Sequence, residues 1–187
     1  VIDNADNPGS GGIGDTTGLF RALMAARPDV PTVFCFFCDP ALVARAQAVG
    51  VGGQVEALLG GRIAPAFGAP VPFAGAVERL TDGRFRNIGP METGAKAELG
   101  PSCVLVDGNL RVIVTSTCQS PNDPGLFVLH GIDLPKQRLI CVKAKNHFRA
   151  GFRPLIPTMI DVDAPGPAAL DQRSLPFRHA PASLRRA

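Results

Sequence analysis

The sequence contains no Trp and no Tyr, so any aromatic stacking would depend on its 11 Phe residues. Single-stranded nucleic acids are commonly bound by stacking of bases on aromatic side chains. A net charge of only +3 adds little attraction for phosphates. The sequence also lacks any apolar run of about 18 residues, the length that suggests a membrane span. We therefore expect no nucleic-acid partner and no contact with a membrane.

Common catalytic signatures are missing as well. The chain has three His residues, His130, His147 and His179, and no H-E-x-x-H motif. A G-x-S-x-G nucleophile motif is absent too. Because a zinc site needs a set of His, Cys or carboxylate ligands, we expect no metal to be held by this chain alone. The sequence contains no complete catalytic constellation.

The five cysteines form an odd number, which argues against a disulfide framework. The motif "CFFC" at residues 35–38 is formally C-x-x-C, but it lies inside the apolar run "TVFCFFC". A free Cys in such a run behaves as a small hydrophobic side chain. We predict free structural thiols in a reducing compartment, and hence a cytoplasmic location.

Along the chain, segments with the pattern of a strand alternate with segments that have the pattern of a helix. Residues 1–5 and 32–38 read as strands, and helices are expected from Asp15 or Thr16 to about Arg27 and from Pro40 to Gly50. After residue 118 the alternation returns, with helices at 123–131 and 147–155 and strands at 138–144 and 158–164. The chain starts without Met, inside an expected strand, so we expect it to be a piece of a longer protein.

The middle of the chain has a different pattern. From 54 to 118 Gly and Pro are frequent, and strands are expected at 71–80, at 83–89 and in a hairpin about Asp107-Gly108-Asn109. We predict an α/β fold with a mixed, partly parallel sheet, flanking helices and an inserted β-rich hairpin region. The whole chain, 1–187, is expected to form a single domain, with the insertion at about 54–118 and a peripheral Arg- and Pro-rich tail at 166–187.

The stretch "DNPGSGGIGDTT", residues 6–17, fits G-x-G-x-x-G through Gly9, Gly11 and Gly14, and it approaches a Walker A loop. However, Asp15 directly follows the last glycine. A carboxylate there would cap the next helix and repel a phosphate. We predict that Asp15 caps this helix and that Asp123 caps the helix after residue 123. Three readings stay open at this point: a capped helix without ligand, a nucleotide- or NAD-binding loop, and another active-site role.

Polar loops follow three of the expected strands. They are residues 6–17, 114–123 and 142–154, and the last contains His147 and Arg149. Open α/β sheets bind ligands at the carboxyl ends of their strands. Asn7 can both donate and accept hydrogen bonds, and the glycines allow close approach of the backbone to a ligand. We expect these loops to meet on one open face.

Together, these segments resemble the C-terminal domain of the MlrC-like metallopeptidases, the microcystinase C proteins. The resemblance rests, in order, on "DNADNPGSGGIGDTTGLFRAL", "VIVTS", "HGID", "VKAKNHFRAGFRPLI" and "VDAPG". It spans the whole chain, and its D-x-x-D-N-P-G-x-G and H-F-R-A elements are the specific ones.

The resemblance implies a zinc-dependent peptidase or amidohydrolase whose metal ligands lie in an N-terminal domain outside this chain. It implies a small peptide or amide substrate, bound by Asp6, Asn7, Gly9, Arg149 and Gln119, with His147 in a supporting catalytic role. The expected partners are that N-terminal domain and the substrate, and a homo-oligomer is a further expectation. The alternatives are a NAD- or nucleotide-binding module and a purely structural or oligomerisation domain.

Overall fold

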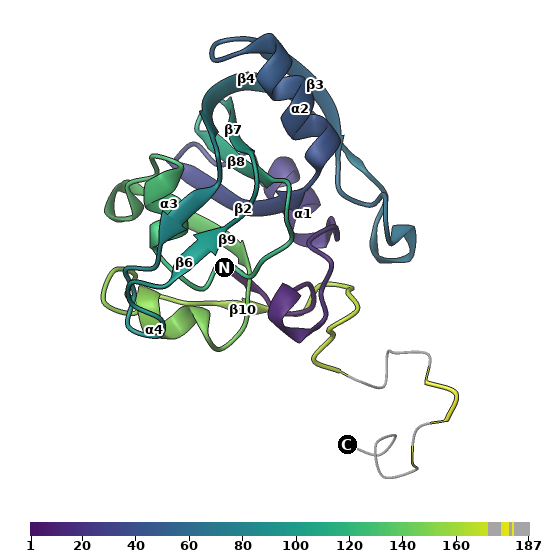
Figure 1. Cartoon of the computed structure of the whole chain (residues 1–187). Helices are drawn as coiled ribbons and strands as arrows, with labels where there is room; N and C mark the ends of the chain where they lie inside the picture. Colours follow the sequence, from purple (N-terminus) through teal and green to yellow (C-terminus); the bar gives the residue numbers. More distant parts are fainter. Residues whose placement is uncertain (172–176, 180, 182–187) are drawn as a thin grey trace.

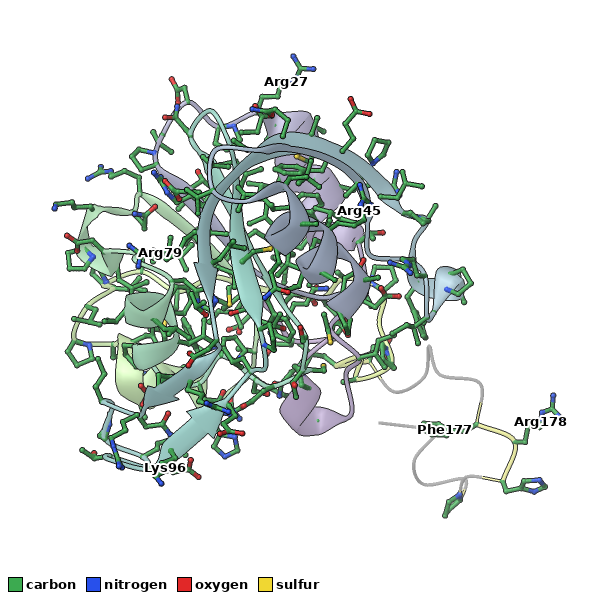
Figure 2. The ribbon with its side chains drawn as sticks, turned by 45° about the horizontal axis from the view of Figure 1, so that its top comes forward. Arg27, Arg45, Arg79, Lys96, Phe177 and Arg178 are labelled. Carbon is green, nitrogen blue, oxygen red and sulfur yellow. The ribbon has the colours of Figure 1, made fainter. Side chains whose placement is uncertain are left out.

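The structure is a computed structural model that describes residues 1–171, 177–179 and 181. Arg173, Arg185 and Arg186 of the predicted tail lie outside the described residues. Phe177 and Arg178 are described, and Figure 2 shows them on a segment set apart from the body. The labelled basic side chains Arg27, Arg45, Arg79 and Lys96 lie at separate points on the outside of the body (Figure 2).

An eight-stranded mixed sheet forms the centre, in the order β10-β1-β9-β2-β8-β7-β4-β3. The first five strands are parallel: β10 (Asp161–Val162), β1 (Ile2–Asp3), β9 (Leu139–Lys143), β2 (Thr32–Cys38) and β8 (Leu110–Thr115). The remaining pairs are antiparallel and use β7 (Ser102–Asp107), β4 (Val71–Thr81) and β3 (Gln54–Leu59). A separate hairpin pairs β5 (Arg84–Arg86) with β6 (Lys96–Glu98). The predicted mixed, partly parallel sheet is confirmed.

Helices cover both faces of this sheet (Figure 1). They are α1 (Gly18–Ala26), α2 (Pro40–Val49), α3 (Gly125–Leu129) and α4 (Phe148–Phe152), with short 3-10 turns η1 (Pro8–Ser10), η2 (Pro65–Phe67) and η3 (Leu134–Lys136). Phe20 of α1 and Leu42 of α2 belong to one apolar cluster, while Phe127 of α3 and Phe152 of α4 belong to another. β7, β8 and β9 contribute alternate residues to the two clusters, because successive side chains of a strand point to opposite faces of the sheet.

The apolar run of β2 accounts for much of this packing. Phe34 and Phe37 point into the first cluster, and Val33, Cys35 and Phe36 point into the second. A strand buried on both faces reads as a continuous apolar run. All five cysteines are free, as predicted, and Cys35 is fully buried.

Several predicted strands are shorter than the sequence suggested, among them 83–89, of which only Arg84–Arg86 forms β5. β1 ends at Asp3 rather than at residue 5, because the Asp3 carboxylate accepts the N–H of Ala5 at 3.1 Å and turns the chain. β10 contains only Asp161 and Val162 of the predicted strand 158–164. In the described part of the chain, no helix combines the length and hydropathy needed to cross a bilayer.

Candidate functional site at the carboxyl ends of the parallel strands

The loops that follow β1, β2, β8 and β9 leave the sheet at one edge. In the parallel ladders Asp3 lies beside Lys143, and Cys38 lies beside Thr115. These four residues end their strands, and parallel strands end on the same side. The expectation that the loops after β1, β8 and β9 share one edge is therefore correct at the level of the sheet.

Asp6 organises the glycine loop from inside. Its carboxylate accepts the backbone N–H groups of Ile13 at 2.9 Å, Gly14 at 3.0 Å and Thr16 at 2.9 Å, and the Thr16 hydroxyl at 3.0 Å. The residue is fully buried. Its burial is at odds with the expectation that Asp6 binds substrate directly. The loop carries a built-in anion where a phosphate-binding loop would offer its N–H groups to a nucleotide.

Lys143 is the counter-charge of Asp6. Its Nζ lies 3.0 Å from Oδ2 of Asp6, donates to the carbonyl of Thr16 at 2.9 Å and lies 4.3 Å from the centre of the Phe37 ring. Burial lowers the pKa of Lys143, although Asp6 opposes this shift. Burial alone would raise the pKa of Asp6, but Lys143 and the bonds from Thr16 bring it below its usual value. Sequence reasoning gave Lys143 no role, because a Lys at the end of "LICVK" looks like the first exposed residue after a strand.

Asp3 completes the buried cluster. It is almost fully buried, and burial raises the pKa of its carboxyl group to about 6, although Lys143 opposes the shift. Its Oδ2 atom makes no hydrogen bond with any described residue. We refer to Asp3, Asp6 and Lys143 as the charged cluster.

Asp15 does not cap α1, so this prediction is wrong. The helix begins at Gly18 with Thr17 as its N-cap, and no side chain bonds its first turn. The Asp15 carboxylate accepts instead from the N–H groups of Ile63 at 2.7 Å and Ala64 at 3.3 Å. Asp15 therefore ties the glycine loop to the turn after β3, a contact across 48 residues that sequence spacing cannot reveal.

Asp123 lies just before α3. Its carboxylate accepts from Gly125 at 2.7 Å, in the first turn of the helix, although Pro124 occupies the N-cap position. It also accepts from Ile88 at 2.9 Å and Gly89 at 2.8 Å, so it fastens the chain after β5 to the start of α3.

Asn7 and Gly9 are joined to the loop after β8 by Ser120. The Ser120 hydroxyl donates to Oδ1 of Asn7 at 2.7 Å and accepts from the N–H of Gly9 at 2.7 Å. The Asn7 side chain also donates to Ser10 at 2.9 Å and accepts from Gly9 at 3.2 Å. Asn7 is thus mostly buried, whereas Gly9 is exposed. Sequence reasoning placed these two loops near each other but did not identify Ser120.

A pocket of about 350 Å³ opens beside this junction. Gly9 and Gln119, two predicted substrate-binding residues, both line it, together with Phe85, Asn87 and Glu92 from the chain around the β5–β6 hairpin. We call it the Gly9–Gln119 pocket.

His147 and Arg149 lie farther along the same edge. Arg149 forms a bidentate pair with Asp161 of β10, at 2.5 and 2.6 Å, and Asn4 donates to the same Asp161 at 3.0 Å. His147 is exposed at the N-cap of α4. Among the described residues no hydrogen bond joins either of them to Asn7 or Gly9. The structure therefore brings Arg149 to β10, and Asn7 and Gly9 to Ser120.

Among the described residues, no group of three or more His, Cys, Asp or Glu side chains could hold a metal ion. The described side chains therefore do not make a zinc site by themselves.

Comparisons with known proteins now assign the fold to a family. The sequence profile described as MlrC C-terminus matches residues 1–179. The chain belongs to the MlrC C-terminal family. It is 27% identical over 152 residues to Microcystinase C from Sphingomonas sp., covering 81% of this chain and 29% of that protein.

A solved structure agrees with this assignment. The crystal structure of a candidate metallopeptidase from Mesorhizobium sp. BNC1 matches with a TM-score of 0.85 and 29% identity, over 94% of this chain and 35% of that one. The chain therefore spans about a third of the length of these relatives. It corresponds to a peptidase-related C-terminal domain of larger proteins.

Proposed function

We propose that this MlrC C-terminal chain forms one wall of the substrate cleft of a zinc-dependent peptidase or amidohydrolase acting on small peptides or amides. The metal ligands would come from an N-terminal domain outside these 187 residues, and the chain alone would be inactive. The observation that carries the proposal is the common edge at which the loops after β1, β8 and β9 leave the sheet.

The chemistry of this edge suits the backbone amides of a peptide or amide substrate. The exposed Gln119 side chain can pair with peptide N–H and C=O groups, while Asn7 and Ser120 hold Gly9 beside it. The strong charges beneath it are already paired within the charged cluster. The exposed His147, in the loop after β9, would serve as a supporting group that contacts substrate.

The test uses a protein that contains this chain together with its metal-binding domain. Asn7→Ala and His147→Ala should each lower kcat/KM by more than about tenfold, which corresponds to roughly 1.4 kcal/mol of transition-state stabilisation. His179→Ala is the control, because His179 is an exposed histidine outside the loops after β1, β8 and β9, and it should leave kcat/KM unchanged.

Bound metal is the second measurement. Zinc content should be the same in all variants, because the proposed ligands lie outside this chain. Full activity of both Asn7→Ala and His147→Ala would instead favour a purely structural or oligomerisation domain.

A further inference from the structure

The Gly9–Gln119 pocket is built from three separate parts of the chain. Pro8 and Gly9 come from the glycine loop, Gln119 and Asn122 from the loop after β8, and Phe85 and Glu92 from the chain around the hairpin. At about 350 Å³ it has the size of a subsite for one side chain, at the lower end of the range for ligand pockets, which begins near 300 Å³.

Several polar groups of the pocket are already used by the fold. Both oxygens of Asp123 accept backbone N–H groups, and Ser120 is held between Asn7 and Gly9. These groups shape the pocket and are not available for a charged ligand.

Other polar groups remain unused. The side-chain amides of Gln119 and Asn122 make no hydrogen bond with any described residue. Glu92 accepts only a 3.3 Å bond from the Asn87 side chain, and no described cation pairs with it. Glu92 is therefore a carboxylate of the pocket with most of its hydrogen-bonding capacity open.

The pocket contrasts with the charge of the chain as a whole. The protein has a net charge of +3, yet no Lys, Arg or His lines this pocket. Pro8 and Phe85, both partly exposed, supply apolar surface between the polar groups. Long basic side chains pack their methylene stem on apolar surface and place their charged end on an acceptor, and a guanidinium pairs with a carboxylate through two parallel bonds.

We propose that the Gly9–Gln119 pocket is a specificity subsite for a basic side chain, arginine or lysine, of a peptide ligand. Glu92 accepts the charged end, the side-chain oxygens of Gln119 and Asn122 accept its remaining N–H groups, and Pro8 and Phe85 contact the stem. This inference rests on the proposed function for its peptide substrate, but binding at the pocket does not require catalysis.

The test is a binding experiment on the 187-residue chain labelled with ¹⁵N. The probe is Nα-acetyl-arginine amide, and its matched neutral analogue is Nα-acetyl-citrulline amide, which has nearly the same shape without the charge. The arginine probe should shift the amide resonances of Gly9, Gln119 and Asn122. The citrulline probe should bind about threefold to fivefold more weakly, the range for a partly exposed ion pair.

Glu92→Gln should remove the difference between the two probes. Glu98→Gln is the control, because Glu98 lies on β6 of the same hairpin, is exposed and pairs with Arg84 outside the pocket. It should keep the preference. Equal binding of both probes to the unmodified chain, resonance shifts confined to other regions, or an equal loss in the two variants would overturn the proposal.

Failure here and failure of the proposed function are distinguishable. If the pocket shows no preference while Asn7→Ala still lowers kcat/KM, the cleft assignment stands without this subsite. If the arginine probe binds as expected while Asn7→Ala and His147→Ala keep full activity, the pocket is a binding site outside any catalytic cleft.

Discussion

Beneath the glycine loop Asp6 and Lys143 are buried as an ion pair, whereas next to α3 His130 is buried as a neutral ring. Each site is less than 2% exposed. Asp6 keeps its charge because it receives four hydrogen bonds from the glycine loop in addition to Lys143. Among the described residues no carboxylate is paired with His130, and burial, helped by the nearby Arg79, lowers its pKa to about 4. A buried group stays charged only where the fold supplies enough partners to replace water.

The neutral site is a directed chain of hydrogen bonds. Nδ1 of His130 must donate to the Leu126 carbonyl at 2.7 Å, since a carbonyl cannot donate, and the neutral ring then accepts at Nε2 from Ser102 at 2.8 Å. Ser102 in turn accepts from Thr81 at 2.8 Å. Protonation of His130 would place a hydrogen on Nε2 and break this order.

The largest effect should come from breaking the charged cluster. Lys143→Met leaves Asp6 and Asp3 as uncompensated buried carboxylates, which should cost about 3–5 kcal/mol of the free energy of unfolding. Lys145→Met, two residues farther on and without an ion pair among the described residues, is the control and should cost less than about 0.5 kcal/mol. Urea unfolding at pH 7 measures both. Equal costs in the two variants would show that Asp6 draws no net support from Lys143.

The second prediction distinguishes the His130 site from the charged cluster by how the stability of the fold depends on pH. The folded pKa of His130, about 4, is below its unfolded value of 6.5, so the unfolded state binds the proton more readily. Stability is therefore lost as the pH falls from 6.5 towards 4, by about 3 kcal/mol for this group alone.

Asp3 acts in the opposite direction over nearly the same range. Its folded pKa, about 6, is above its unfolded value of 3.8, so it favours the folded state as the pH falls and loses that contribution as the pH rises through 6. Relative to the unmodified chain, His130→Gln should flatten the acid loss of stability, and Asp3→Asn should steepen it. Urea unfolding at pH 7 and pH 4.5 gives both slopes. The same slope in His130→Gln and in the unmodified chain would contradict the buried neutral ring.

The same contrast shows what the sequence could predict. The order of strands and helices followed from local patterns. The run "TVFCFFC" has the composition of a buried strand, and it forms β2. Asp39-Pro40 is typical of a helix start, and the Asp39 carboxylate accepts the N–H of Leu42 at 3.0 Å. The common edge of the loops followed from parallel strands. The partners of Asp6, Asp15 and Ser120 did not follow, because each bonds across the fold. Asp15 reaches Ile63, and Ser120 reaches Asn7 across 113 residues. A short polar residue after a glycine has the same local appearance whether it caps a helix or ties two loops together.

The smallest effect concerns Ser120, whose hydroxyl joins the glycine loop to the loop after β8. Ser120→Ala removes the donor to Asn7 and the acceptor of the Gly9 N–H, and it should cost about 1–2 kcal/mol, since each neutral hydrogen bond has a net value of about 1 kcal/mol. Ser116→Ala is the matched control in the same loop, since the Ser116 hydroxyl bonds only the Pro101 carbonyl. Ser116→Ala should lose less stability because only one hydrogen bond is removed, and hydrogen exchange at the Gly9 amide should speed up only in Ser120→Ala. The Gly9–Gln119 pocket should loosen with it, because Gly9 and Gln119 line it from the two loops that Ser120 connects. Equally fast exchange of the Gly9 amide in both variants would show that the contact between the two loops does not depend on the Ser120 hydroxyl.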